Sequence, residues 1–143
     1  MARIKIEFPE TGLFTTEIKI RISDINYGGH LGHDAVLSIA HEARMRFLAS
    51  LGYSEMDVEG AAIIMNDAAV VYRSEAVYGE VLRVDVGAAD AHRKGCDLLY
   101  RISATDGREV ALVKTGIMFF DYASRRPVSA PLRALEQFGL VTE

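Results

Sequence analysis

The chain has 143 residues, of which half are hydrophobic and a quarter are charged, and its formal net charge is -4. This length and composition predict one folded domain over residues 1–143 and exclude a disordered chain. The acidic balance argues against nucleic-acid binding, and no apolar run is long enough to span a membrane. One cysteine, Cys96, and an N-terminus without an apolar signal core lead us to expect a cytoplasmic protein with an inert thiol.

The first half of the chain predicts a strand, a turn and a long helix. Isoleucines alternate with charged residues over the predicted strand, residues 13–23. A glycine-containing turn follows at residues 27–29, where the backbone can approach a ligand closely. Residues 34–51 then carry apolar side chains at helical spacing over a wide arc, which indicates a mostly enclosed helix. We expect Asp34 to cap this helix and Gly52 to end it.

The second half of the chain predicts consecutive strands. They cover residues 62–75, 81–93, 97–105 and 110–122, and a short helix follows at 130–138. The Asp106-Gly107 pair predicts a hairpin turn between the last two strands. Because no helix separates consecutive strands, they cannot form a parallel sheet. We therefore predict an α+β fold in which an antiparallel sheet packs one face on the long helix.

The junction between the first strand and the helix resembles a known family. Asp24 follows the strand, Gly29-His30 follows Asp24, and the helix carries Glu42-Ala43-Arg44 at the family's spacing. With these residues, the chain is similar to acyl-CoA thioesterases of the 4-hydroxybenzoyl-CoA thioesterase type. The resemblance implies their hotdog fold, in which a curved antiparallel sheet wraps one long helix.

The chain departs from this family's pattern at four positions in the junction. A second acid often follows the first one two residues later, and this chain has Asn26 there. Gly32 stands where the family often has Asn, and His33 and Asp34 stand where it usually has small or amide residues. These departures leave the acyl group open, and they also leave open whether the acyl carrier is CoA or a protein.

The resemblance implies an acyl-CoA thioester hydrolase, which needs an attacking oxygen and donors for the carbonyl oxygen as it becomes negative. Asp24 is our candidate for the first requirement, either as general base for water or as direct nucleophile. Backbone N–H groups between Gly29 and His33 are candidates for the second, because a helix start favours negative charge. His30 either orients the thioester carbonyl or braces the loop.

Further residues are candidates for binding the substrate. Within the junction these are Tyr27, Gly28, Leu31 and His33. Arg93 and Lys94, beside a predicted glycine turn, are candidates for binding the phosphates of CoA.

The helix acid of the family falls on Glu42, and in some hotdog thioesterases the catalytic carboxylate lies on this helix. Here Arg44 and Arg46 follow Glu42, so we expect an ion pair instead. His30, His33, Asp34 and His41 lie within a short span, but we expect His30 before the helix, and His41-Glu42 does not continue into a zinc-protease motif, so we expect neither a metal nor a cofactor. The resemblance implies a homodimer or homotetramer with a continuous sheet and a site between subunits.

Two other functions remain open. A hotdog hydratase acting on enoyl thioesters shares Asp24 and Asn26, but its motif has a proline where this chain has Tyr27. A non-catalytic module that binds acyl thioesters would use the same fold, because fold does not fix function. Thiol release from acyl-CoAs, measured beside hydration of crotonyl-CoA, separates the three functions.

Overall fold

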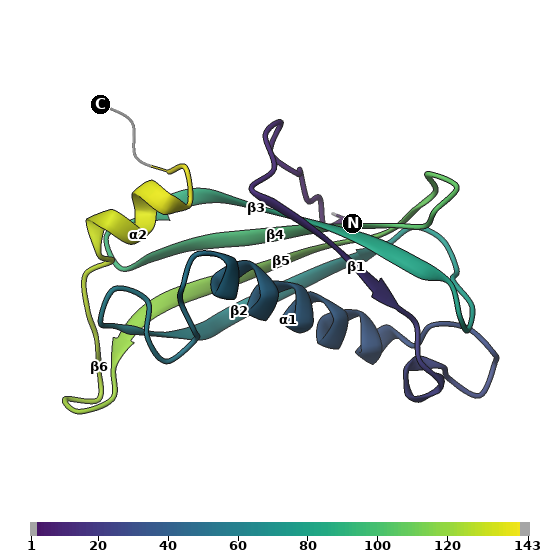
Figure 1. The fold of residues 1–143 in the computed structure, drawn as a ribbon, viewed down its shortest axis with the longest axis horizontal. Coiled ribbons are helices and arrows are strands. Elements are labelled where there is room, and N and C mark those ends of the chain that lie inside the picture. Colours follow the sequence, from purple (N-terminus) through teal and green to yellow (C-terminus); the bar gives the residue numbers. More distant parts are fainter. Residues whose placement is uncertain (1–2, 141–143) are drawn as a thin grey trace.

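A six-stranded antiparallel sheet curves around one long helix (Figure 1). The computed structural model describes residues 3–140. The strands are β1 (Phe14–Lys19), β2 (Ala62–Tyr72), β3 (Val81–His92), β4 (Gly95–Ser103), β5 (Glu109–Asp121) and β6 (Arg126–Pro127). Their order is β1-β3-β4-β5-β2, with β6 beside β5. The helices are α1 (His33–Ser50), the 3-10 helix η1 (Ile22–Asp24) and the short α2 (Leu132–Gln137).

The hydrophobic core lies between α1 and the inner face of the sheet. The largest fully buried side chains from the two layers include Phe47, Leu48, Leu98, Tyr100, Ile102, Ile117 and Phe119. Ala40 and Ala43 of α1 are fully buried, and their small side chains let the strands approach the helix closely. The predicted α+β fold is therefore confirmed.

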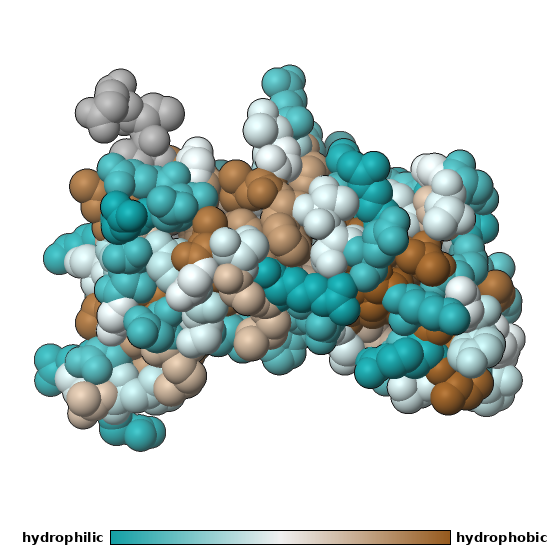
Figure 2. Space-filling view, in the orientation of Figure 1, coloured by the Kyte–Doolittle hydropathy of each residue, from teal (hydrophilic) through white to brown (hydrophobic). Residues whose placement is uncertain are grey.

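The surface over α1 is mainly hydrophilic, with hydrophobic residues toward the end of the molecule where α1 begins (Figure 2). Within residues 3–140, no helix has the length and apolar character needed to cross a bilayer.

Most element boundaries agree with the predictions, and α1 lies within one residue of its predicted range. Gly52 has a φ of +81°, which suits a residue just past a helix end. The first strand is shorter than predicted, because the chain leaves the sheet after Lys19 and turns into η1. The prediction that Asp34 caps α1 is wrong. Gly32 is the N-cap, and Asp34 lies inside the first turn, where its negative charge suits the helix dipole.

Strand β2 forms one edge of the sheet and contains a bulge. Met65 pairs with Ile117 of β5, while Asp67 pairs with the next residue, Gly116, so Asn66 is the extra residue. The Asp67 carboxylate accepts hydrogen bonds from the Gly116 amide at 3.0 Å and from Lys114 Nζ at 2.8 Å. These contacts fix the bulge against β5.

Candidate active site

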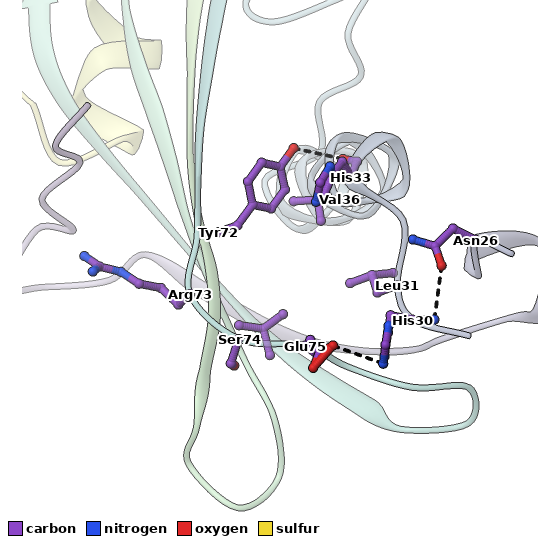
Figure 3. Close-up of a pocket in the computed structure, with 10 residues that line it drawn as sticks. Asn26, His30, Leu31, His33, Val36, Tyr72, Arg73, Ser74 and Glu75 are labelled. Carbon is purple, nitrogen blue, oxygen red and sulfur yellow. Dashed lines mark hydrogen bonds and ion pairs between the residues drawn. The ribbon is translucent and has the colours of Figure 1, made fainter. Parts of the chain in front are cut away.

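A cavity of about 300 Å³ lies between the start of α1 and the segment that follows β2 (Figure 3). Its walls mix apolar and polar side chains from three parts of the chain. The lining residues are Asn26, His30, Leu31, His33, Val36, Tyr72, Arg73, Ser74, Glu75 and Val110. The site therefore includes the predicted junction and adds a second wall that the sequence reasoning did not find.

The loop before α1 is closed around the side chain of Asn26. Its Oδ1 atom accepts hydrogen bonds from the backbone N–H groups of Gly28, at 3.0 Å, and His30, at 3.2 Å. The Asn26 backbone N–H donates to the carbonyl oxygen of His30 at 2.8 Å. Because Oδ1 accepts these two hydrogen bonds, the side-chain amide presents its Nδ2 end to the rest of the site. Nδ2 points toward the start of α1 (Figure 3). Asn26 therefore presents a fixed hydrogen-bond donor to the cavity.

The first backbone N–H groups of α1 are available to a ligand. The N–H groups from Gly28 to Gly32 all donate to acceptors within the protein. Those of His33 and Asp34 have no acceptor within residues 3–140, because the N-cap is a glycine without a side chain. Of the N–H groups predicted to hold an oxyanion, that of His33 is thus the one left available.

Asp24 lies beneath this loop and is 5% exposed. Its carboxylate accepts a hydrogen bond from the backbone N–H of Arg21 at 2.8 Å and contacts the Arg21 guanidinium at 3.3 Å. Its carbonyl oxygen accepts from the backbone N–H of Gly32 at 2.9 Å. Asp24 does not line the cavity, and its contacts brace η1 and the start of α1. Its predicted catalytic role stays a prediction.

Two polar pairs join the opposite walls of the cavity. His30 Nε2 lies 3.0 Å from Glu75 Oε2. The rings of His33 and Tyr72 have centroids 4.4 Å apart, and the Tyr72 hydroxyl donates to the His33 carbonyl oxygen at 3.2 Å. Both pairs connect the junction to the chain at and just after the end of β2 (Figure 3).

The predicted binding residues do not all meet at this cavity. Leu31 and His33 line it, whereas Tyr27 is fully exposed beside it. Arg93 and Lys94 lie in the turn between β3 and β4, at the same end of the sheet as the start of β2, with β5 between them. The cavity is at the other end of β2, about 30 Å away for a strand of this length. One chain alone does not bring the basic turn to the cavity.

Two other candidate groups are accounted for by structural contacts. Glu42 accepts a hydrogen bond from Arg46 Nε at 2.8 Å, which confirms the predicted ion pair. Burial raises the pKa of the Cys96 thiol to about 12, so the thiol is protonated at neutral pH and is not an activated nucleophile.

Sequence reasoning missed Tyr72, Glu75 and the intervening residues of the second wall. Locally these residues read as the end of a strand, and nothing in their spacing marks a site. What brings them to the junction is a long-range contact, in which the Leu31 N–H donates to the carbonyl oxygen of Ala76 at 2.8 Å.

Comparison with known proteins gives a family. Residues 20–138 match the thioesterase-like superfamily. A 1,4-dihydroxy-2-naphthoyl-CoA thioesterase from Synechocystis is 21% identical with a TM-score of 0.79, over 88% of this chain and 95% of that chain. A DHNA-CoA thioesterase from Staphylococcus aureus is 21% identical with a TM-score of 0.74, and the match covers 90% of this chain and 96% of that chain. A Staphylococcus aureus protein in complex with CoA is 19% identical with a TM-score of 0.80, and the match covers 94% of this chain and 86% of that chain. No curated protein matches the sequence.

The structural likeness to these proteins confirms the predicted hotdog fold. The family match runs from before the junction to the end of α2 and so includes every part of the sheet except β1. On this basis, the chain belongs to the thioesterase-like superfamily of thioester hydrolases.

Proposed function

We propose that this protein hydrolyses acyl-CoA thioesters in the cavity at the start of α1. The observation that carries the proposal is the set of donors there. The backbone N–H group of His33 and the side-chain amide of Asn26 are available at the cavity, where a thioester carbonyl would enter. One such donor typically lowers the barrier of acyl transfer by about 3 kcal/mol, because it stabilises the developing oxyanion.

Water must be activated for this reaction, and the sequence assigns that task to Asp24. A carboxylate in this role removes a proton from water or attacks the carbonyl carbon itself. To reach a substrate, the Asp24 side chain would have to exchange its contacts with Arg21 for contacts with the thioester. If it does so, Asp24→Asn will suppress hydrolysis by at least about a hundredfold.

CoA is the proposed carrier of the acyl group, and the CoA complex of the Staphylococcus aureus relative supports this choice. One similar structure is a 1,4-dihydroxy-2-naphthoyl-CoA thioesterase, and another is a DHNA-CoA thioesterase. The contacting rings of His33 and Tyr72 offer an aromatic surface in the cavity wall, against which a flat acyl group of this kind could pack. We therefore propose an aromatic acyl-CoA as the first substrate to test.

A homodimer would complete the site. Strand β2 is an edge with unpaired backbone groups, and its side chains Met65 and Tyr72 are 38% and 48% exposed. If two copies pair their β2 strands antiparallel, the start of one β2 lies beside the end of the other. The partner's Arg93 and Lys94 would then lie at the same end as the cavity of this chain, where they could bind the CoA phosphates.

The test is a panel of short, medium, long and aromatic acyl-CoAs, with release of free thiol as the readout. The proposal expects thiol release, with the fastest turnover for an aromatic ester. Hydration of crotonyl-CoA without thiol release would contradict it in favour of a hydratase. Binding of the esters with no turnover would contradict it in favour of a non-catalytic binding module.

A further inference from the structure

The N-terminal arm, residues 3–9, crosses the face of the sheet that points away from α1 (Figure 1). The arm and Leu99 of β4 line the same cavity. Tyr100, the neighbour of Leu99, points the other way and contacts Arg44 of α1. Leu99 is nevertheless 6% exposed, although no second helix lies on this outer face. The arm therefore acts as the cover of the outer face.

The arm is anchored at Phe8 and Pro9. The guanidinium carbon of Arg101 lies 4.5 Å from the centroid of the Phe8 ring, and Asp85 holds this guanidinium through hydrogen bonds of 3.1 and 3.2 Å. Pro9 lies against Gly87, where a Cβ atom would come within 3.2 Å of the proline ring. The anchor thus fixes one end of the arm on β3 and β4.

A row of paired residues leads from this anchor straight across the sheet to its edge. Gly87 of β3 pairs with Leu99 of β4. Leu99 also pairs with Lys114 of β5, which in turn pairs with Ala69 of β2. The last three residues of the row all line the cavity under the arm. The arm therefore lies over a path that ends at the edge strand.

The arm is long enough to follow this path to its end. Three strand spacings cover about 14 Å, whereas the five extended residues from Pro9 to Ile4 cover about 16 Å. Ile4 and Ala69 line the same cavity. The end of the arm therefore lies at β2, the strand along which the proposed homodimer pairs.

The end of the arm is weakly held by its own chain. Ile4 is 61% exposed. Within residues 3–140, no backbone hydrogen bond joins residues 3–12 to the sheet, and the first one comes from the Leu13 N–H. An apolar side chain and unpaired backbone groups are thus left exposed beside an edge strand that is itself unpaired.

The charges at this edge suit a second copy of the chain. On the outer face, Asp67 and Asp97 share one lysine, Lys114, at 2.8 and 3.7 Å, and the Asp67 side chain is 58% exposed. The end of the arm, residues 3–6, carries Arg3 and Lys5 and no acid. An arm that reaches a second copy brings these cations to a surface with more carboxylates than lysines.

We infer that the arm is an interaction surface for a second copy of this chain, in which residues 3–6 contact the other copy's β2 strand and arm. The inference rests on the homodimer of the proposed function and goes beyond it, because it adds a contact on the outer face of the continuous sheet. Ile4, exposed in one chain, is buried in the dimer. If the pairing is centred on the middle of β2, the two copies of Ala69 lie about 14 Å apart.

Cross-linking tests this contact directly. Ile4→Cys is treated with a bis-maleimide whose span matches this distance, and mass spectrometry identifies the linked peptides. We expect a link between position 4 of one copy and position 4 of the other, and buried Cys96 does not compete. Ile22→Cys is the matched control, because Ile22 is 71% exposed and lies on η1, which follows the strand at the opposite edge of the sheet.

Dimer dissociation measures what the contact contributes. Analytical ultracentrifugation over a dilution series gives the Kd of wild type, Ile4→Glu, Phe8→Ala and Ile22→Glu. We expect Ile4→Glu to raise the Kd at least about tenfold, because the dimer would bury the new charge. Phe8→Ala releases the anchor and will change the Kd in the same direction, whereas Ile22→Glu will stay within about twofold of wild type. Circular dichroism checks the fold of each variant.

Either of two results would overturn the inference while the dimer stands. One is a protein of dimer mass in which Ile4→Cys gives no more linked product than Ile22→Cys. The other is a folded Ile4→Glu variant that dissociates like wild type. A monomeric wild type refutes the homodimer and the inference together, and thiol release from acyl-CoAs decides the hydrolase proposal separately.

Discussion

The Tyr72 hydroxyl donates a hydrogen bond to the backbone carbonyl of His33 at 3.2 Å, and the rings of the two residues lie 4.4 Å apart. This pair links the last residue of the edge strand β2 to the first residue of α1. It closes one side of the cavity directly beside the available N–H groups of the helix. The edge of the sheet and the proposed oxyanion donors therefore keep a fixed relative position.

Changes at Tyr72 will separate the two parts of this contact. Tyr72→Phe keeps the ring contact and loses the hydrogen bond, so we expect a loss of about 1 kcal/mol in the free energy of unfolding and little change in KM. Tyr72→Ala removes both and will raise KM for an aromatic acyl-CoA more than for a short aliphatic one. Urea unfolding and thiol-release kinetics give the two readouts. Equal KM changes for the two esters would argue against an acyl group lying beside this ring.

Glu55 is expected to make stability depend on pH. Burial alone would raise the pKa of Glu55, but the hydrogen bond and positive charge of Arg44 outweigh burial and hold the pKa below its usual 4.5. A carboxylate with a lowered folded-state pKa stabilises the fold above its unfolded-state pKa, and this contribution is lost as the pH falls through the folded-state value. Unfolding free energy should therefore decline below about pH 4.5.

Glu55→Gln tests the same contact by removing the charge. Arg44 is 6% exposed, and its guanidinium donates to Glu55 at 2.7 Å and to the Tyr100 hydroxyl at 3.0 Å. Loss of its charged partner leaves a buried cation, which we expect to cost about 2 kcal/mol of unfolding free energy and to flatten the acid dependence. Glu42→Gln breaks an exposed pair with Arg46 and should cost less than about 0.5 kcal/mol. Similar costs for the two variants would contradict this prediction.

The proposed homodimer predicts that Met65→Glu shifts the protein toward a monomer. The substitution puts a charge on a partly exposed residue of the edge strand, along which the second copy would pair. Light scattering after size-exclusion chromatography measures the mass, and thiol release should fall with it. Leu132→Glu changes an equally apolar and more exposed position on α2 and should leave the mass unchanged. A Met65→Glu protein that keeps the wild-type mass would place the interface elsewhere.

The basic turn predicts a difference between whole and truncated substrates. Arg93→Ala combined with Lys94→Ala should raise KM for an acyl-CoA about tenfold, which corresponds to about 1.4 kcal/mol of lost binding. The same acyl group on N-acetylcysteamine carries no phosphate, so its KM should not change. An equal effect on both substrates would show that the turn acts on structure and not on phosphate recognition.

The layered fold could be predicted because its determinants are local. Each pattern predicts the structure of its own segment. These patterns are the helical spacing over residues 34–51, the alternation in the strands and the Asp106-Gly107 turn, and the structure agrees with them closely. The end of the first strand was misjudged because Asp24 accepts the Arg21 N–H and pulls the chain into a 3-10 turn. Alternation of apolar residues continues through that turn and conceals it.

Half of the cavity wall could not be predicted from the sequence, for a different reason. The junction carries visible chemistry, so Leu31 and His33 could be placed at the site from their neighbours in sequence. Glu75 enters the site through contacts between segments that are far apart in the chain, and its side chain resembles any charged residue after a strand. Asn26 was visible as a departure from one family pattern and as a match to the hydratase motif, but its role depends on which amide atom faces the cavity.

The bulge at Asn66 determines which residues of the edge strand β2 point to which face of the sheet. Before it, Met65 pairs with the buried Ile117, and after it Tyr72 pairs with the buried Ala111, so an odd-numbered and an even-numbered residue share the helix-facing side. Without the extra residue, strict alternation would carry Tyr72 to the opposite face and open the cavity wall. The one extra residue of the bulge, far from the reacting groups, thus decides whether Met65 and Tyr72, on either side of it, both face the helix.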